Sequence, residues 1–190
     1  SGTIALLSPP FGGLTDPGYI RNYPPGVREN GGQYTHGAIW LARACYQLGR
    51  TREGYELLRD LLPETHNTQR YLVEPYVLAG DVSMADGQLG RGGWSWYTGA
   101  AGWYYRTVQE ELLGLTLHEG LLTIRPQLPQ SWKECHVTWR LQGLELEITM
   151  VRGTLPGILL DDMPANEQID CRQLDGHHHI QVTLPEGESE

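Results

Sequence analysis

The hydrophobic period of the sequence changes once, near Gly114, and this change constrains the fold more than any other feature. Before it, apolar residues recur at helical spacing, as in THGAIWLARACYQLGR at 35–50. After it, apolar and polar residues alternate, as in LELEITMV at 144–151, which is the pattern of a half-buried strand. The change predicts an α+β chain with a helical part over residues 1–114 and an antiparallel β domain over residues 115–190.

Residues that start and end helices divide the first part into four predicted helices. Gly49 closes the first and Thr51 caps the second, so that these two form a short antiparallel hairpin. Pro75 is tolerated in the first turn of the third helix, and Gly114 ends the fourth. The helices are predicted within residues 35–50, 51–62, 73–84 and 98–113, after a loop-rich segment at 1–34 for which we favour a functional role.

Turn residues separate short alternating segments in the second part. LTLHEGLLTI at 115–124 predicts a hairpin that turns at Glu119–Gly120. The His177–His179 run is interpreted as a solvated strand, and because no Cys/His spacing suits zinc, no metal site is predicted. Further strands are predicted at 135–141, 144–151, 157–160 and 178–184.

Composition and charge exclude several classes of protein. The formal net charge of −9 and the pI of 5.2 argue against a nucleic-acid partner, although they allow a local positive site for a small anion. Cys45, Cys135 and Cys171 are an odd number without metal-ligand spacing, and we interpret them as small buried residues of a reduced, cytosolic chain. The sequence has no run of about 18 apolar residues and no signal-peptide pattern at its start, so neither a membrane span nor a leader is predicted.

The stretch GRGGWSWYTGAAGWYYR at 90–106 interleaves glycines with large aromatic residues. Gly lets another group approach the backbone closely, and Trp and Tyr offer flat apolar faces with a polar group on the rim. The whole chain has 6 Trp and 10 Tyr but a single Phe, which is a bias toward half-polar surfaces. The stretch predicts a surface for a flat, polar ligand such as a sugar, whereas for Trp103 we favour a place in the helix core.

Two predicted helix starts carry residues suited to an anion. His36 lies in the first turn after YPPGVRENGGQYT at 23–35, where backbone N–H groups and the helix dipole favour negative charge. Thr98 as N-cap, with Gly99 beside it, offers a second cradle of this kind. We expect both starts to converge on one phosphate, with the aromatic residues as a sugar-stacking wall beside it. In the alternative interpretation, Glu29 and His36 only cap a helix.

Two charged residues near these starts are candidates for further ligand contacts. The guanidinium of Arg28 suits a carboxylate, a phosphate or sugar hydroxyls. The Glu74 carboxylate, at the start of the predicted third helix, either holds sugar hydroxyls or complements the helix dipole. The residue pattern leaves both roles of Glu74 open.

The chain contains three motifs in this order: YPPGVRENGGQYTHGAIWLA, VEPYVLAGDV and GRGGWSWYTGAAGWYYR. Through these motifs it resembles the C-terminal part of glycoside hydrolase family 94. This family contains cellobiose, chitobiose and β-1,2-oligoglucan phosphorylases, and PPGVRENGGQYTH and GRGGWSWYTG look closest to its cyclic β-1,2-glucan synthase branch. The likeness covers roughly residues 8–150. It implies the last helices of an (α/α)6 barrel followed by an antiparallel β-sandwich C-terminal domain.

The resemblance also implies a chemistry, the inverting phosphorolysis of a β-linked glucoside to α-glucose 1-phosphate. Inorganic phosphate is the co-substrate and no cofactor is implied. Carried over by motif, His36, Thr98 and Gly99 hold the phosphate. The residues implied on the sugar side are Tyr23, Arg28 and Glu29, together with Gln33 and Glu74.

The general acid of the family, an Asp in a WND-like motif, has no counterpart in these 190 residues. The acidic segments LTDPGY and LAGDVS do not replace it. An inverting phosphorolysis without a positioned proton donor loses a factor of roughly 10² to 10⁴. We therefore expect a C-terminal piece of a larger enzyme that is inactive or nearly so on its own.

The same resemblance implies partners and a location. The expected partners are a β-glucan oligosaccharide, phosphate and the remainder of the barrel from an upstream segment, without nucleic acid. Uncovered helix faces predict that the piece self-associates. The resembling synthases are attached to the inner membrane with this part on the cytoplasmic side, which implies a cytoplasmic location. Two alternatives stay open, a non-catalytic carbohydrate-binding protein and a domain that docks onto a partner chain.

Overall fold

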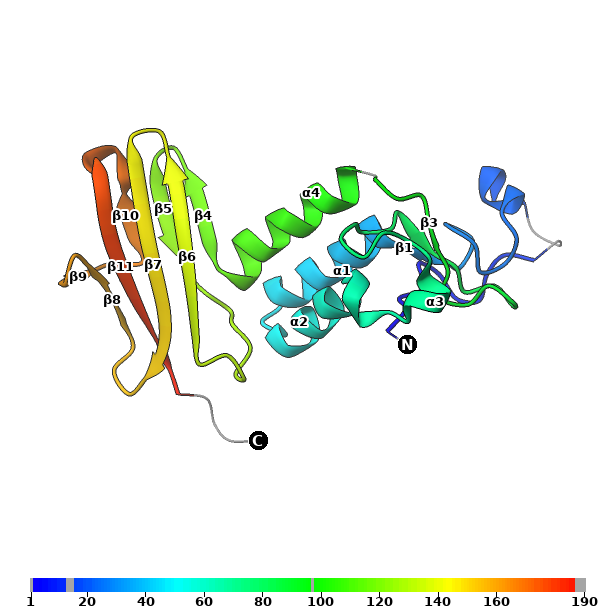
Figure 1. Cartoon of the computed structure of the whole chain (residues 1–190), viewed down its shortest axis with the longest axis horizontal. Coiled ribbons are helices and arrows are strands. Elements are labelled where there is room, and N and C mark those ends of the chain that lie inside the picture. Colours follow the sequence, from blue (N-terminus) through cyan, green and yellow to red (C-terminus); the bar gives the residue numbers. More distant parts are fainter. Residues whose placement is uncertain (1, 13–15, 97, 187–190) are drawn as a thin grey trace. The chain divides into compact units, whose positions relative to one another are not determined.

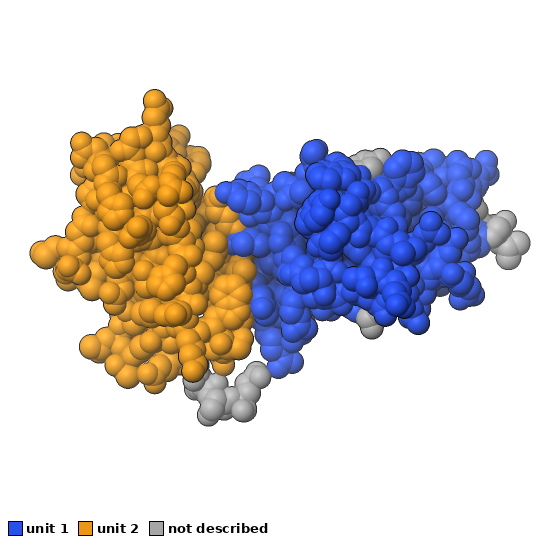
Figure 2. Space-filling view, viewed as in Figure 1, with its two compact units in different colours: residues 1–108 blue, residues 109–190 orange. Residues whose placement is uncertain are grey.

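The structure, a computed structural model, describes residues 2–12, 16–96 and 98–186 and contains both helices and sheets. It divides into two compact units, unit 1 with Ser1–Val108 and unit 2 with Gln109–Glu190 (Figure 2). The sequence pattern placed the boundary a few residues further on, after residue 114. The division falls within the π-helix Val108–Leu112, a few residues before the first strand of unit 2.

Unit 1 contains all α-helices of the described chain, and the first, second and fourth predicted helices are confirmed. The fourth continues from its α-helical part into a π-helix, Val108–Leu112, and Gly114 follows with a φ of 63°. None of the helices in the described part of the chain combines the length and the apolar character of a membrane span. The α-helices are α1 (Thr35–Gln47), α2 (Thr51–Asp60), α3 (Thr68–Tyr71) and α4 (Thr98–Thr107), and short 3₁₀ helices cover Gly18–Asn22, Pro63–Thr65 and Cys171–Gln173.

Helix α1 is the centre of unit 1, because both α2 and α4 pack against it (Figure 1). Ala38 and Ile39 of α1 form a buried cluster with Leu61, which follows α2, and with Ala100 of α4. The Trp103 ring packs against this cluster and is partly buried. This confirms the helix-core interpretation of Trp103.

The turn between α1 and α2 explains why the hairpin forms. Gly49 adopts a φ of 73°, which favours glycine, and its N–H donates to the Tyr46 carbonyl at 2.9 Å. The Arg50 N–H donates to the Cys45 carbonyl at 2.8 Å, so the end of α1 has the two bonds of a Schellman motif. The prediction that Thr51 caps α2 is wrong, because Thr51 is already helical and no side chain caps this start.

The third predicted helix is also wrong. Residues Asp81–Val82 form strand β2, which lies between β1 (Gln33–Tyr34) and β3 (Gly92–Gly93) in an antiparallel sheet. Just before β2, the Gly80 N–H donates to the Trp94 carbonyl at 2.9 Å, and its own carbonyl accepts from Thr35 at 3.0 Å. These hydrogen bonds join segments that are distant in the sequence, so a local apolar pattern could not reveal them.

Unit 2 consists of two sheets, and strands of both sheets contribute buried apolar residues (Figure 1). The strand order is β10-β5-β4 in the smaller sheet and β6-β7-β11-β8-β9 in the larger. The predicted turn between β4 and β5 is confirmed, with φ of 50° at Glu119 and 81° at Gly120. The strands are β4 (Leu115–His118), β5 (Leu121–Ile124), β6 (Glu134–Leu141), β7 (Leu144–Gly153), β8 (Gly157–Leu160), β9 (Met163–Ala165), β10 (Gln168–Asp170) and β11 (Gly176–Pro185).

One pairing in the larger sheet corrects the expectation of a wholly antiparallel domain. Strand β11 runs parallel to β7, with Ile180 opposite Ile148. Parallel neighbours need a long connection, and the chain between these two strands supplies it through β8, β9 and β10. The run His177–His179 lies in β11, as its interpretation as strand required.

Candidate functional site

A cavity in unit 1 opens where α1 and α4 begin and where the β1-β2-β3 sheet ends. It contains about 340 Å³ of empty space, including the part open to solvent. Its lining combines a guanidinium, a carboxyl group, an imidazole and aromatic rings. The lining residues are Arg28, Tyr34, His36, Gly80, Asp81, Trp94, Gly99 and Ala100.

The first turn of α1 places His36 in this cavity. The imidazole packs edge-on against the Trp40 ring, with 4.8 Å between ring centroids, and lies 6.0 Å from the Trp103 ring. The Nε2 atom of His36 is buried and has no hydrogen-bond partner among the described residues. No side-chain hydrogen bond caps this start of α1, so the buried ring nitrogen and the positive end of the helix dipole are available to a ligand.

The start of α4 lies directly against this imidazole. A Cβ built on Gly99 would be 3.5 Å from both Nδ1 and Cε1 of His36, which is ordinary van der Waals contact. The two predicted cradles therefore do converge in one cavity, through His36 and Gly99. Thr98 is exposed at the first position of α4 and does not line the cavity.

Aromatic rings hold the Arg28 guanidinium at another wall. It lies 5.2 Å from the centre of the Tyr23 ring and 5.1 Å from the centre of the Trp94 ring, in cation–π contact with both. Its Nε is 3.5 Å from Oε2 of Glu29, an ion pair in which neither atom has a hydrogen-bond partner in the described part of the chain. Arg28 has a φ of 48°, an uncommon backbone conformation for a residue with a side chain.

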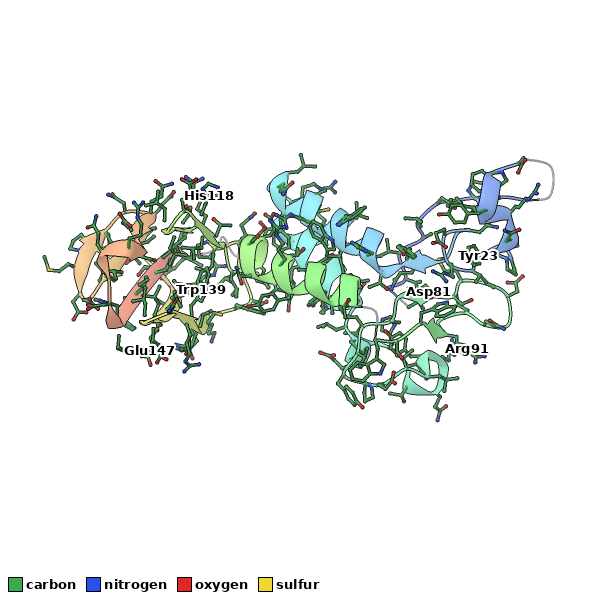
Figure 3. All side chains as sticks on the ribbon, turned by 90° about the horizontal axis from the view of Figure 1, so that it is seen from above. Tyr23, Asp81, Arg91, His118, Trp139 and Glu147 are labelled. Carbon is green, nitrogen blue, oxygen red and sulfur yellow. The ribbon has the colours of Figure 1, made fainter. Side chains whose placement is uncertain are left out.

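Asp81 contributes the carboxyl group of the cavity from the central strand β2 (Figure 3). The residue is 5% exposed, and its Oδ1 is buried without a hydrogen-bond partner among the described residues. Burial raises the pKa of this carboxyl, the Arg28 charge lowers it in part, and the Glu29 charge raises it again. Gly93 on β3 leaves the necessary room, since a Cβ there would be 3.0 Å from Oδ1.

Two predicted sugar-side residues lie away from the cavity. Gln33 is buried, and its Oε1 accepts a hydrogen bond from the Ile4 N–H at 3.0 Å, so its side chain faces the N-terminal segment. Glu74 lies in a loop, where its Oε1 accepts from the Trp96 indole N–H at 3.0 Å. Its own backbone N–H and then Trp96 lower the pKa of Glu74. No helix begins at Glu74, so the helix-dipole role of this residue is wrong.

The tryptophans of the glycine-rich stretch divide into two kinds. Trp103 is partly buried against the helical cluster, whereas Trp94 and Trp96 are 57% and 65% exposed. Both exposed residues have left-handed backbone conformations, with φ of 55° and 66°. Trp94 borders the cavity, and Trp96 meets the Tyr76 ring at 6.1 Å between centroids. Of these three tryptophans, only Trp94 and Trp96 have the exposure that a stacking wall requires.

Sequence reasoning missed Asp81, Tyr34 and Gly80 as cavity residues. The LAGDVS segment was predicted as part of a helix and of a family motif, and its Asp was considered only as a replacement for the missing general acid, which was rejected. The available signal was an acidic residue between small and apolar neighbours, a pattern that indicates a buried carboxyl. Because the segment was assigned to a helix, that signal was not connected with Arg28 or His36.

Residues 1–114 match the family model of the glycosyl hydrolase 94 superfamily, catalytic domain. The chain therefore belongs to this superfamily, and the resemblance to glycoside hydrolase family 94 is confirmed. The matched segment contains every residue of the cavity. It also extends beyond α4 to the start of the first sheet of unit 2.

The relatives include a cyclic β-1,2-glucan synthase, as the motifs indicated, and also phosphorylases. The chain is 42% identical over 160 residues to the cyclic β-(1,2)-glucan synthase NdvB of Rhizobium meliloti, which covers 81% of this chain and 6% of that protein. It is 31% identical to the solabiose phosphorylase of Paenibacillus borealis, over 68% of this chain and 17% of the relative. It is 27% identical to the N,N′-diacetylchitobiose phosphorylase of Vibrio furnissii, over 95% of this chain and 24% of the relative. The chain thus spans less than a quarter of these three relatives.

Proposed function

We propose that this chain forms part of the phosphate and sugar sites of an inverting phosphorylase or cyclic glucan synthase-type enzyme that acts on β-linked glucans. The convergence of the starts of α1 and α4 on one cavity, beside Arg28, is the observation that carries this proposal. Membership of the superfamily supports it, as do a glucan synthase and disaccharide phosphorylases among the relatives. Phosphate is the co-substrate, and no cofactor enters the proposal.

The phosphate lies at the helix starts in this proposal. The buried Nε2 of His36 donates to a phosphate oxygen, and backbone N–H groups of α1 and α4 meet the remaining charge. Gly99 allows the phosphate to approach the start of α4 closely, and the exposed Thr98 hydroxyl contacts it from the rim. Tyr23, which stacks on Arg28, and Glu29 belong to the neighbouring sugar side. Gln33 acts only by holding the N-terminal segment.

The proton donor of the reaction comes from outside these 190 residues, since they contain no WND-like motif. In an inverting reaction this acid protonates the leaving oxygen while phosphate attacks the anomeric carbon from the opposite face. The chain by itself is therefore inactive or nearly so. Its role is to position phosphate and sugar, and the enzyme that carries it acts in the cytoplasm.

The proposal extends to the architecture of the larger enzyme. Helices α1, α2 and α4 are the last helices of an (α/α)6 barrel, and the two sheets of unit 2 are a C-terminal β-sandwich. Exposed apolar side chains on α1 and α4 then meet the remaining helices of the barrel, or a second copy of the piece when those helices are missing. The side chains are those of Trp40, Leu41 and Tyr105, with exposures of 52%, 47% and 71%.

Phosphate binding by the 190-residue chain tests the proposal, measured by isothermal titration calorimetry with inorganic phosphate. We expect His36→Ala to weaken binding at least about tenfold, because the buried donor is lost. Thr98→Ala should weaken binding less, since its hydroxyl is exposed. His118→Ala, at an exposed position of β4, is the matched control and should bind as the wild type does. Unchanged phosphate binding by His36→Ala would show that His36 does not hold the phosphate.

A non-catalytic carbohydrate-binding role is the second candidate, favoured by the exposed Trp94 and Trp96 rings. An immunoblot of the source cells separates the two candidates. The phosphorylase proposal expects a band far above 21.3 kDa, because the acid and the rest of the barrel lie upstream. A band at 21.3 kDa would favour the binding role.

A further inference from the structure

Asp81 is the residue whose chemistry the fold leaves least explained. The residue is only 5% exposed, yet Oδ1 makes no hydrogen bond to any described residue. Buried polar groups are nearly always paired, and an unpaired buried carboxyl opposes folding. A residue in this state needs a reason outside the fold itself.

Asn30 shows what a buried polar side chain with a structural role looks like in the same unit. It is 1% exposed and uses both ends of its amide. Its Nδ2 donates to the carbonyls of Phe11 and Tyr23, and its Oδ1 accepts from the Phe11 N–H at 2.7 Å. Asn30 thereby joins two loops. Among the described residues, no such bond is made to Oδ1 of Asp81, so tying segments together is not the role of that atom.

The surroundings of Asp81 leave space on its cavity side. On β3 the neighbouring position is Gly93, where even a Cβ would come within 3.0 Å of Oδ1. The charged and titratable groups around the carboxyl are Arg28 and Glu29, with Tyr34 and His36 in the same cavity lining. The Trp94 ring completes this wall. A carboxyl group, a guanidinium and an aromatic face are the groups that bind a sugar through its hydroxyls and its apolar face.

Charge decides which of the two expected ligands lies at this wall. Phosphate is an anion, and the carboxyl groups of Asp81 and Glu29 oppose it. Sugar hydroxyls are neutral donors that a carboxylate accepts well. Phosphate therefore favours the His36 and Gly99 end of the cavity, and the sugar favours the end at Asp81.

We infer that Asp81 binds the sugar directly, with Oδ1 accepting a hydrogen bond from a hydroxyl group of a neutral glucoside beside the Trp94 ring. This inference rests on the proposed function and adds a residue to its sugar side. It also gives the site a preference, because the same carboxylate opposes an anionic sugar.

The test measures the binding of two ligands to the intact 190-residue chain by calorimetry. The ligands are inorganic phosphate and sophorose, the β-1,2-linked disaccharide of glucose. Asp81→Asn keeps the shape of the side chain and removes its charge. We expect it to weaken sophorose binding at least about tenfold, while phosphate binding stays equal or becomes tighter. Asp86→Asn, an exposed carboxylate in the same segment, is the matched control and should change neither.

The outcomes separate this inference from the proposed function. Sophorose binding that Asp81→Asn leaves intact overturns the inference and leaves the function standing. A wild-type chain that binds neither ligand overturns both. Equal loss of both ligands in Asp81→Asn assigns the residue a structural role and also overturns the inference.

A second measurement on the wild type does not depend on the folding of a variant. Carbon-13 NMR of the labelled Asp81 carboxyl follows its titration with and without sophorose. A hydroxyl that donates to the carboxylate favours the charged form, so sophorose should lower the observed titration midpoint. A midpoint that sophorose leaves in place overturns the inference.

Discussion

At the scale of single residues, the cavity of unit 1 places hydrogen-bond donors and hydrogen-bond acceptors on different walls. His36 and the helix starts offer donors, whereas Glu29 and Asp81 offer acceptors, and Arg28 interacts electrostatically with both carboxyl groups. A reaction between phosphate and a sugar needs both kinds of group side by side. The buried unpaired atoms at His36 and Asp81 lower the stability of the fold, and the proposed binding of phosphate and sugar would supply their missing partners.

Asp81 should make the stability of unit 1 depend on pH, and the direction of this dependence can be stated. Burial raises the pKa of its carboxyl in the folded chain, so the folded state holds the proton more tightly than the unfolded chain, where the Asp pKa is about 3.9. The resulting stability is present below about pH 3.9 and is lost as the pH rises through the folded-state value. Asp81→Asn cannot ionise and does not lose this stability. The free energy of unfolding of the variant, relative to that of the wild type, should therefore increase as the pH rises through this window.

Urea unfolding of both proteins at a series of pH values measures this difference. Asp86→Asn serves as the control, because its carboxylate is exposed. A difference between Asp81→Asn and the wild type that stays constant with pH would contradict the prediction.

At the scale of elements, the sequence pattern predicted those elements that are formed by interactions between residues close together in the chain. Helix α1 with its glycine end and the β4–β5 turn were both read from neighbouring residues. The β1-β2-β3 sheet and the parallel β11–β7 pair were not, because their hydrogen bonds join segments far apart in the chain. The site divides in the same way. Helix-start chemistry indicated His36 and Gly99, whereas the importance of Asp81 depends on a sheet that the sequence did not reveal.

Two glycines should respond oppositely to the same substitution, because their elements use them differently. Gly49 ends α1 with a φ of 73°, and Gly49→Ala should lower the free energy of unfolding by about 1 kcal/mol. Gly102 lies inside α4, and a Cβ added there would meet no described atom within 4 Å outside its own helix turn, so Gly102→Ala should raise stability by about 0.5–1 kcal/mol. Thermal unfolding of both variants measures the sign of each change in stability. Changes of the same sign would show that packing, rather than backbone conformation, determines the effect of these substitutions.

At the scale of the whole molecule, the chain combines two units with separate cores. The helical cluster around Ile39 belongs to unit 1, and the buried strand residues around Ile148 belong to unit 2. Every cavity residue in the described chain comes from unit 1. The cavity and the strand core are therefore formed by different parts of the sequence, and we expect that each can be changed without the other.

A core substitution in unit 2 tests this separation. Ile148 is 1% exposed on β7, opposite Ile180 of the parallel strand, and Ile148→Ala should cost unit 2 about 2–5 kcal/mol of unfolding free energy. The proposed phosphate binding at the His36 cavity should stay within about twofold of the wild type, because the cavity and the strand core belong to different units. Urea unfolding followed by circular dichroism measures the first effect, and calorimetry below the transition measures the second. Val151→Ala, at a half-buried position of the same strand, should cost less and serves as the matched control. Phosphate affinity that falls in step with the stability of unit 2 would show that the cavity depends on the strand core.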